Sequence, residues 1–235
     1  LRQKVSARER QAAESRWNLS ATAGRLAKFN EKLTFQSGLR KQLLAKSIVK
    51  REDLAKDIEN AGAHILAIKD MAGLLKPYAA TELITALKDT VKIPIHLHTH
   101  DTSSLQPATY LKAIEAGIDV VDVALGSMSG LTSQPNFNSI VEMMRFHERE
   151  QVMDTNRLNE FSNYFDNVRD YYYPFESGLM ASTSSVFQHE IPGGQYSNLK
   201  PQAVALGLAN KFEEIKLMYG EVNQLFGDVV KVTPS

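Results

Sequence analysis

The amino-acid sequence predicts an α/β fold in which a partial TIM-type (β/α) barrel is followed by a mostly helical subdomain. Between residues 54 and 126, apolar strand-like segments alternate with amphipathic helical segments, as in a parallel sheet with helical crossovers. Beyond about residue 150 the strand signals stop, and apolar residues recur at helical spacing. We therefore expect a partial barrel over 54–150 and a helical subdomain over 151–235.

The 235-residue chain is 43% hydrophobic, which is enough for one large domain or two small ones. No apolar run approaches the roughly 20 residues of a membrane span, so we expect no membrane contact and a cytoplasmic location. The chain has no cysteine, which excludes disulfides, a thiolate nucleophile and a cysteine-ligated metal. Any metal must therefore be held by nitrogen and oxygen ligands.

The zero net charge hides an asymmetry along the chain. Residues 1–50 carry 12 Lys and Arg against 3 acidic residues, a balance of +9. Because the whole chain has 27 basic and 27 acidic residues, residues 51–235 carry 15 basic against 24 acidic residues, a balance of −9. We interpret 1–53 as a basic, poorly defined N-terminal segment. Because no aromatic interleaving or binding motif accompanies the charge, we expect no nucleic-acid partner.

The (β/α) units have separate start and stop signals. A first helix is expected over Glu52–Asn60, ended by Ala61-Gly62, and a strand follows over His64–Lys69. Pro77 opens the next helix, whose apolar face has helical spacing. The remaining elements are an apolar run from Ile93 into His96–Asp101, a helix at about 107–116 ended by Ala116-Gly117, and a strand over Ile118–Leu125.

Three of the six histidines lie within five residues, at positions 96, 98 and 100. In a strand these side chains would share one face, and two of them at i and i+2 could hold one Zn²⁺, Mn²⁺ or similar ion. The alternative is a half-buried strand whose histidines are satisfied by hydrogen bonds. The spacing alone leaves both interpretations open.

Polar residues end each predicted strand, at Lys69-Asp70, His98–Asp101 and Gly126-Ser127. In (β/α) barrels the chemistry gathers at the C-terminal ends of the strands. We therefore expect these residues to converge on one side of the barrel.

The C-terminal part is expected to contain helices over 156–173 and 211–226 with aromatic and aliphatic residues at helical spacing. Such stripes are typical of core packing rather than of a cofactor site. Between the helices, Pro192–Leu199 is rich in turn residues and predicts a loop whose backbone could approach a ligand.

Four motifs follow one another along the chain: AIKDMAGLLKP (67–77), HLHTHDTS (96–103), SMSGLTSQP (127–135) and GGQYSNL (193–199). In this order they resemble the carboxyltransferase domain of pyruvate carboxylases. The resemblance covers about residues 54–235. Oxaloacetate decarboxylase α chains and transcarboxylase subunits share the architecture but usually carry a small residue at the position of Asp101, which favours the pyruvate carboxylases.

The resemblance implies metal-dependent carboxyl transfer from carboxybiotin to pyruvate, giving oxaloacetate. Lys69 matches the family's carbamylated lysine ligand, and His98 and His100 match its two histidine ligands of a divalent metal, Mn or Zn. Ser197 stands where we place the family's proton-transferring threonine, as a catalytic and substrate-binding residue. The biotin would be carried on another domain, and residues 151–235 would be the helical conserved carboxylase subdomain.

The implied partners are pyruvate, carboxybiotin and the remainder of the carboxylase polypeptide, in a homo-oligomeric full enzyme. The family's aspartate metal ligand, its substrate-binding arginine, its ATP-binding domain and its biotin attachment site have no counterpart in this sequence. We therefore expect a fragment with little activity alone, whose first fifty residues could come from a shifted reading frame. The alternatives are a structural or interaction fragment with an exposed sheet edge, or an oxaloacetate decarboxylase α-type carboxyltransferase.

Overall fold

The computed structural model describes residues 51–176 and 178–227. It divides the chain into two units, Leu1–Asp53 and Leu54–Ser235, and the elements that position the site belong to the second unit. The predicted basic segment lies, up to residue 50, outside the described residues.

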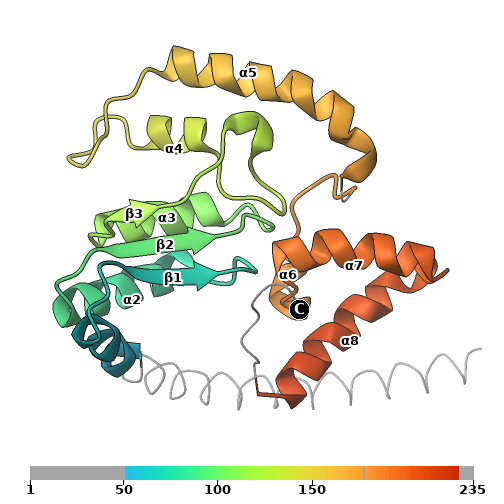
Figure 1. The fold of residues 1–235 in the computed structure, drawn as a ribbon, viewed down its shortest axis with the longest axis horizontal. Coiled ribbons are helices and arrows are strands. Elements are labelled where there is room, and N and C mark those ends of the chain that lie inside the picture. The colour runs from blue at the N-terminus through green and yellow to red at the C-terminus, as the bar shows by residue number, and fades with distance from the viewer. Residues whose placement is uncertain (1–50, 177, 228–235) are drawn as a thin grey trace, which may run out of the picture. The chain divides into compact units, whose positions relative to one another are not determined.

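Within the described residues, the strands β1 (Leu66–Asp70), β2 (Ile95–Thr99) and β3 (Val120–Val121) form one parallel sheet in the order β1-β2-β3. Helices α2 (Pro77–Thr90) and α3 (Gln106–Glu115) connect the strands and pack against each other on one face of the sheet (Figure 1). This (β/α) repeat confirms the predicted partial barrel. Only β3 is much shorter than its predicted span of 118–125.

Helices bury one face of the sheet, whereas the side chains of the other face are exposed or half-buried. One face buries Leu66, Ile95 and Leu97 against the helices, together with Ile84 and the fully buried Tyr110. Because side chains alternate along a strand, the residues between them lie on the opposite face. The register places Ala67, His96 and Val120 in one row and Lys69 beside His98 in the next, where the Asp122 carboxylate contacts His98. These side chains are exposed or half-buried.

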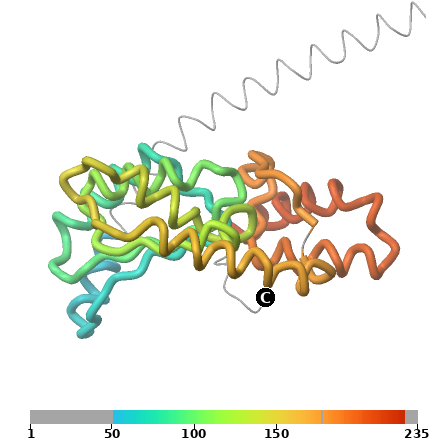
Figure 2. Tube along the Cα trace, turned by 90° about the horizontal axis from the view of Figure 1, so that it is seen from above, coloured from blue at the N-terminus to red at the C-terminus, as the bar shows by residue number. Residues whose placement is uncertain are grey.

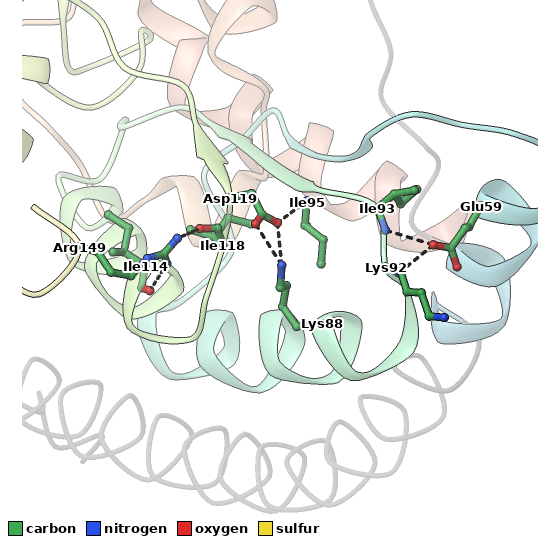
Figure 3. A network of polar contacts seen from close by, with 9 residues as sticks. All are labelled: Glu59, Lys88, Lys92, Ile93, Ile95, Ile114, Ile118, Asp119 and Arg149. Carbon is green, nitrogen blue, oxygen red and sulfur yellow. Dashed lines mark hydrogen bonds and ion pairs between the residues drawn. The ribbon is translucent and has the colours of Figure 1, made fainter. Parts of the chain in front are cut away.

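The N-terminal ends of the strands are joined by a network of polar contacts that Figure 3 shows. Asp119 accepts hydrogen bonds from the backbone N–H of Ile95 at 2.8 Å and from the Lys88 ammonium at 2.9 Å. Glu59 accepts the backbone N–H groups that lead into β2, and Arg149 donates at 2.6 Å to the carbonyls of Ile114 and Ile118. Side chains of Glu59, Asp119 and Arg149 thus satisfy the backbone N–H and carbonyl groups at this end of the sheet.

The C-terminal part of the described chain is helical. The chain turns back at η3, so that α8 runs beside α6 (Figures 1 and 2). No helix in the described ranges is long and apolar enough to cross a membrane. The elements are η1 (Gly126–Met128), α4 (Phe137–Met143), α5 (Thr155–Tyr172), η2 (Tyr173–Phe175), α6 (Val186–His189), α7 (Gly193–Ala205), η3 (Ala209–Lys211) and α8 (Phe212–Leu225).

Two predictions for this part are wrong. The aromatic stripe of α5 is not core: no residue of this helix is buried, and Tyr172 is 62% exposed. The α8 stripe is core only in part, since Phe212 is buried and Ile215 packs against its cluster, whereas Met218 and Val222 are exposed. The predicted loop over 192–199 is the beginning of α7, because Pro192 precedes a helix that tolerates glycine in its first turn.

Candidate metal centre

His98 and His100 meet at the C-terminal end of β2. Their Nε2 atoms lie 3.2 Å apart, and the ring planes are inclined by 71°. His98 belongs to the strand, whereas His100 follows its last residue and is buried, with 8% exposure. The strand therefore supplies one imidazole, and the turn after it swings the second one towards the first.

The other nitrogen of each ring is already bound. Nδ1 of His98 lies 2.7 Å from the Asp122 carboxylate, and Nδ1 of His100 lies 2.6 Å from the carbonyl oxygen of Thr132. A carboxylate and a carbonyl can only accept, so both Nδ1 atoms carry the proton. In their neutral forms, the two rings then present Nε2 lone pairs to each other.

Two facing lone pairs repel unless a positive charge lies between them. Two imidazole nitrogens at about 2.0–2.1 Å from one ion, at angles between octahedral and tetrahedral, are about 2.8–3.4 Å apart, and the 3.2 Å separation falls inside this range. The pair thus fits two ligands of a divalent metal. The interpretation as histidines satisfied by hydrogen bonds accounts for the Nε2 pair only if one ring carries a proton on both nitrogens and donates from its Nε2 to the other ring.

Electrostatics favour the neutral, metal-binding form of His100. Burial lowers the pKa of its imidazole, as does the charge of Lys69, against the raising effects of the Thr132 carbonyl and Asp70. Because a ligand histidine must be neutral, this environment prepares the ring for a cation at neutral pH.

Lys69 lies beside His98, since the two residues are register partners on neighbouring strands of the open face. Its side chain is exposed. No group of three or more His, Cys, Asp or Glu side chains that could hold a metal is found in the described part of the chain. A third ligand within this sheet would therefore have to come from a residue of another kind, and Lys69 is the neighbour in register.

Sequence reasoning missed the role of Asp122. Its carboxylate binds both histidines of the open face, with Nε2 of His96 on Oδ1 and Nδ1 of His98 on Oδ2, each at 2.7 Å. Burial raises the pKa of this carboxyl, but the hydrogen bonds from His98 and His96 outweigh it, and the net pKa is lowered. The signal was an aspartate embedded in a predicted apolar strand, two residues after the register partner of His96.

The loop after β3 fixes His100. Gly130 and Leu131 both have a left-handed backbone, with φ of 76° and 54°, and the turn that they form aims the Thr132 carbonyl at the imidazole. The next carbonyl, of Ser133, accepts the N–H of Asp101 at 2.8 Å. A non-glycine side chain in this conformation costs about 1–2 kcal/mol, so the surrounding contacts maintain a strained turn directly behind His100.

Helix α7 begins against the same residues. A Cβ atom on Gly193 would lie 2.7 Å from Nδ1 of His100 and 2.7 Å from the Thr132 carbonyl oxygen, so only glycine fits there. One turn later, the Ser197 hydroxyl lies 3.2 Å from Oγ1 of Thr132 and 3.2 Å from the Gly193 carbonyl. Ser197 therefore contacts the residues behind His100, and its hydrogen bonds do not extend to the Nε2 pair.

The comparisons with known proteins identify the family. The HMGL-like family model matches residues 26–164, which begins upstream of the predicted boundary at 53/54, and the model described as the conserved carboxylase domain matches residues 186–235. Pyruvate carboxylase of Bacillus subtilis is 53% identical over 182 residues, covering 77% of this chain and 16% of the relative. Human mitochondrial pyruvate carboxylase is 46% identical over 185 residues, again covering 77% of this chain and 16% of the relative.

Solved structures give the same answer. The carboxyltransferase domain of Rhizobium etli pyruvate carboxylase, with pyruvate, superimposes with a TM-score of 0.78 at 49% identity, covering 80% of this chain and 32% of that domain. The chain thus spans about 16% of the length of the pyruvate carboxylases that it matches. The resemblance predicted from the four motifs is confirmed: this chain belongs to the HMGL-like family and is similar, within it, to part of the carboxyltransferase domain of pyruvate carboxylases.

Proposed function

We propose that this chain contributes a divalent metal site to the transfer of a carboxyl group from carboxybiotin to pyruvate, as part of a biotin-dependent pyruvate carboxylase. The observation that carries the proposal is the Nε2 pair of His98 and His100, 3.2 Å apart, with both Nδ1 atoms committed to acceptors. A two-nitrogen site on N and O ligands is compatible with Mn or Zn.

Lys69 is the proposed third ligand, as a carbamate. An ammonium cannot bind a cation, whereas the adduct of the neutral amine with CO₂ is an anionic oxygen ligand. The exposure of the Lys69 side chain and its register with His98 support this role, because CO₂ can reach the amine and the product would lie beside the histidines. When bound, the metal would polarise the oxygens of pyruvate and stabilise the negative charge of an enolate.

The reaction requires a proton to leave the methyl group of pyruvate and the resulting carbon to bond to the carboxyl carbon, while the biotin nitrogen that loses the carboxyl group gains a proton. Ser197 is our proposed proton carrier, because it stands where the resemblance places the family's proton-transferring threonine; its hydroxyl donates to the Gly193 carbonyl at 3.2 Å. The same hydroxyl also contacts the Thr132 side chain, and the Thr132 carbonyl orients His100. Ser197 would therefore also help to position His100.

Metal content and native mass of the purified chain test this proposal directly. We expect near-stoichiometric Mn or Zn by elemental analysis and the added mass of one CO₂, both lost in the double variant His98→Ala, His100→Ala. The variant His64→Ala is the matched control, because it removes an imidazole from the described chain away from the pair. Metal-free protein, or metal retained without both histidines, would contradict the proposed site.

A second candidate is a fragment that acts by interaction alone. The observation that favours it is the sheet face that no described element covers, with Ala67 and Lys69 exposed and Val120 41% exposed, beside β1, which is an edge strand among the described residues. On this reading the expected partner is the remainder of the carboxylase polypeptide, in a homo-oligomeric enzyme. Stable, metal-free chain that binds the missing part of the domain would favour it over catalysis.

An oxaloacetate decarboxylase α-type carboxyltransferase is the remaining alternative. Asp101 favours the carboxylase over this alternative, because the decarboxylase α chains usually carry a small residue at its position. Here its buried carboxylate accepts the N–H of Gln106, the first residue of α3, at 3.1 Å. Carboxylation of pyruvate and decarboxylation of oxaloacetate, assayed with the reassembled enzyme, separate the two. The cytoplasmic location expected from the sequence stays a prediction.

A further inference from the structure

Asp122 holds an imidazole on each of its carboxylate oxygens, and only one of these rings belongs to the proposed ligand set. Oδ2 accepts from Nδ1 of His98, and Oδ1 accepts from Nε2 of His96, both at 2.7 Å. His96 is therefore tied to the candidate metal centre through a carboxylate, although it is not itself a ligand.

The backbone of Asp122 is fixed from the covered side of the sheet. Its N–H donates to the Leu97 carbonyl at 3.2 Å, and its carbonyl accepts from the hydroxyl of the fully buried Tyr110 at 2.7 Å. The side chain alone could still rotate, because the Asp122 side chain is 38% exposed and water competes for its oxygens. A second imidazole on the free oxygen restricts this rotation.

The tautomer of His98 depends on this carboxylate. With the proton on Nδ1, the Nε2 lone pair is available to a cation. Without the carboxylate, the proton would move to Nε2, since there it can donate to the bare Nε2 of His100 at 3.2 Å. Such a hydrogen bond would consume both lone pairs, so the histidine pair would close on itself instead of accepting a metal.

We propose that Asp122 is a positioning residue that keeps His98 in its metal-binding tautomer, and that His96 is the anchor that fixes Asp122. The inference rests on the proposed metal site for its consequence, but its geometric part concerns the metal-free chain. Carboxylate partners of ligand histidines typically change metal affinity by about 10–100-fold.

The first experiment reads the tautomer without metal, by long-range ¹H–¹⁵N NMR of the imidazoles in the full chain. We expect Nδ1–H for His98 in the parent and Nε2–H in Asp122→Ala. His96→Leu should give a mixture of the two forms. A parent chain with His98 already in the Nε2–H form, or no change in Asp122→Ala, would overturn the inference whether or not metal binds.

The second experiment measures Zn²⁺ affinity by competition with a chelator, in a double-mutant cycle. Asp122→Ala should weaken binding about 10–100-fold and His96→Leu by less than about 10-fold, with no further loss when His96→Leu is added to Asp122→Ala. Equal losses in both backgrounds would overturn the anchor role of His96. The matched control is Asp119→Ala, which removes a carboxylate near the other end of β3 and should leave Zn²⁺ affinity unchanged.

The outcomes separate the two proposals. If the parent chain binds no Zn²⁺ through His98 and His100, the proposed metal site fails, and the tautomer of His98 still decides the role of Asp122. If the parent binds Zn²⁺ and neither Asp122→Ala nor His96→Leu weakens binding, the metal site stands and the positioning role fails.

Discussion

The two ends of the sheet are built from the same kinds of residue but differ in how many polar atoms are satisfied by hydrogen bonds. At the N-terminal end, Asp119 and Arg149 bind backbone groups and a lysine, and the polar atoms of the network are satisfied by one another (Figure 3). At the C-terminal end, Asp122 and the Thr132 carbonyl satisfy one nitrogen of each histidine and leave the two Nε2 atoms facing each other. A network whose polar atoms are all satisfied stabilises the fold, whereas one that leaves two Nε2 atoms facing each other can bind a cation.

The largest effect is expected from Gly193→Ala, at the C-terminal end. The added Cβ would overlap Nδ1 of His100 and the Thr132 carbonyl, so His100 or α7 must move. We expect a loss of about 3 kcal/mol in the free energy of unfolding, at the upper end of overpacking effects, together with loss of metal binding. Chemical denaturation and chelator competition measure the two losses.

Gly194→Ala is the matched control, because nothing lies within 4 Å of the position of its Cβ. It adds the same methyl group to the same turn of α7. If both variants lost metal equally, the close approach of Gly193 to His100 would not be what matters.

At the N-terminal end, Asp119→Ala should lower the free energy of unfolding without lowering metal affinity. It leaves the backbone N–H of the buried Ile95 and the Lys88 ammonium without their acceptor, which costs about 1–2 kcal/mol of unfolding free energy. Metal affinity should stay as in the parent. The exposed pair of Glu142 and Arg145 provides a control, since Glu142→Ala should change neither quantity measurably. A loss of metal in Asp119→Ala would show that the two ends are coupled.

Acid should remove the contribution of Asp119 selectively. Burial raises the pKa of this carboxyl, but the N–H of Ile95 and the charges of Lys88 and Arg149 outweigh it, and the net pKa lies below the ordinary 3.8. A lowered folded-state pKa gives stability that is present above the ordinary value and is lost as pH falls through the folded value. The stability difference between the parent and Asp119→Asn should therefore shrink below about pH 4 in urea titrations. A difference that is constant down to pH 2 would contradict this assignment.

The smallest effect is expected from Ser197→Ala. It removes a half-buried hydroxyl whose two contacts are both 3.2 Å long, so the loss in unfolding free energy should be about 0.5–1 kcal/mol. Zn²⁺ affinity should change little. In the reassembled enzyme, a large fall in carboxylation with unchanged metal affinity would support proton transfer by Ser197, and Ser197→Thr should then retain activity.

The sequence predicted the (β/α) part well because local signals and packing agree there. Pro77 begins α2, and Gly62 and Gly117 adopt left-handed backbones, with φ of 90° and 96°, where the stops were expected. The polar ends of β1 and β2 also fall on the predicted side, since parallel strands bring their C-terminal ends together. These features depend on residues close in sequence, which periodicity can detect.

The helical part was predicted less well because its burial depends on partners far away in sequence. The apolar spacing in α5 predicts a core helix, yet Phe161 and Tyr172 are exposed, because periodicity alone cannot say whether a partner covers a face. The same limit applies to the site. The motifs named His98 and His100, but the bonds from Asp122 and from the Thr132 carbonyl come from 24 and 32 residues away.

The uncovered face of the sheet also sets the dielectric environment of any chemistry at the histidines. At 4 Å, two unit charges interact by about 1 kcal/mol in water but by about 4 kcal/mol at an effective dielectric constant of 20. Lys69, His98 and Asp122 face the solvent side of the sheet in the described chain, so a developing enolate there would gain only the smaller energy. Covering this face would strengthen the stabilisation several-fold without changing a single ligand.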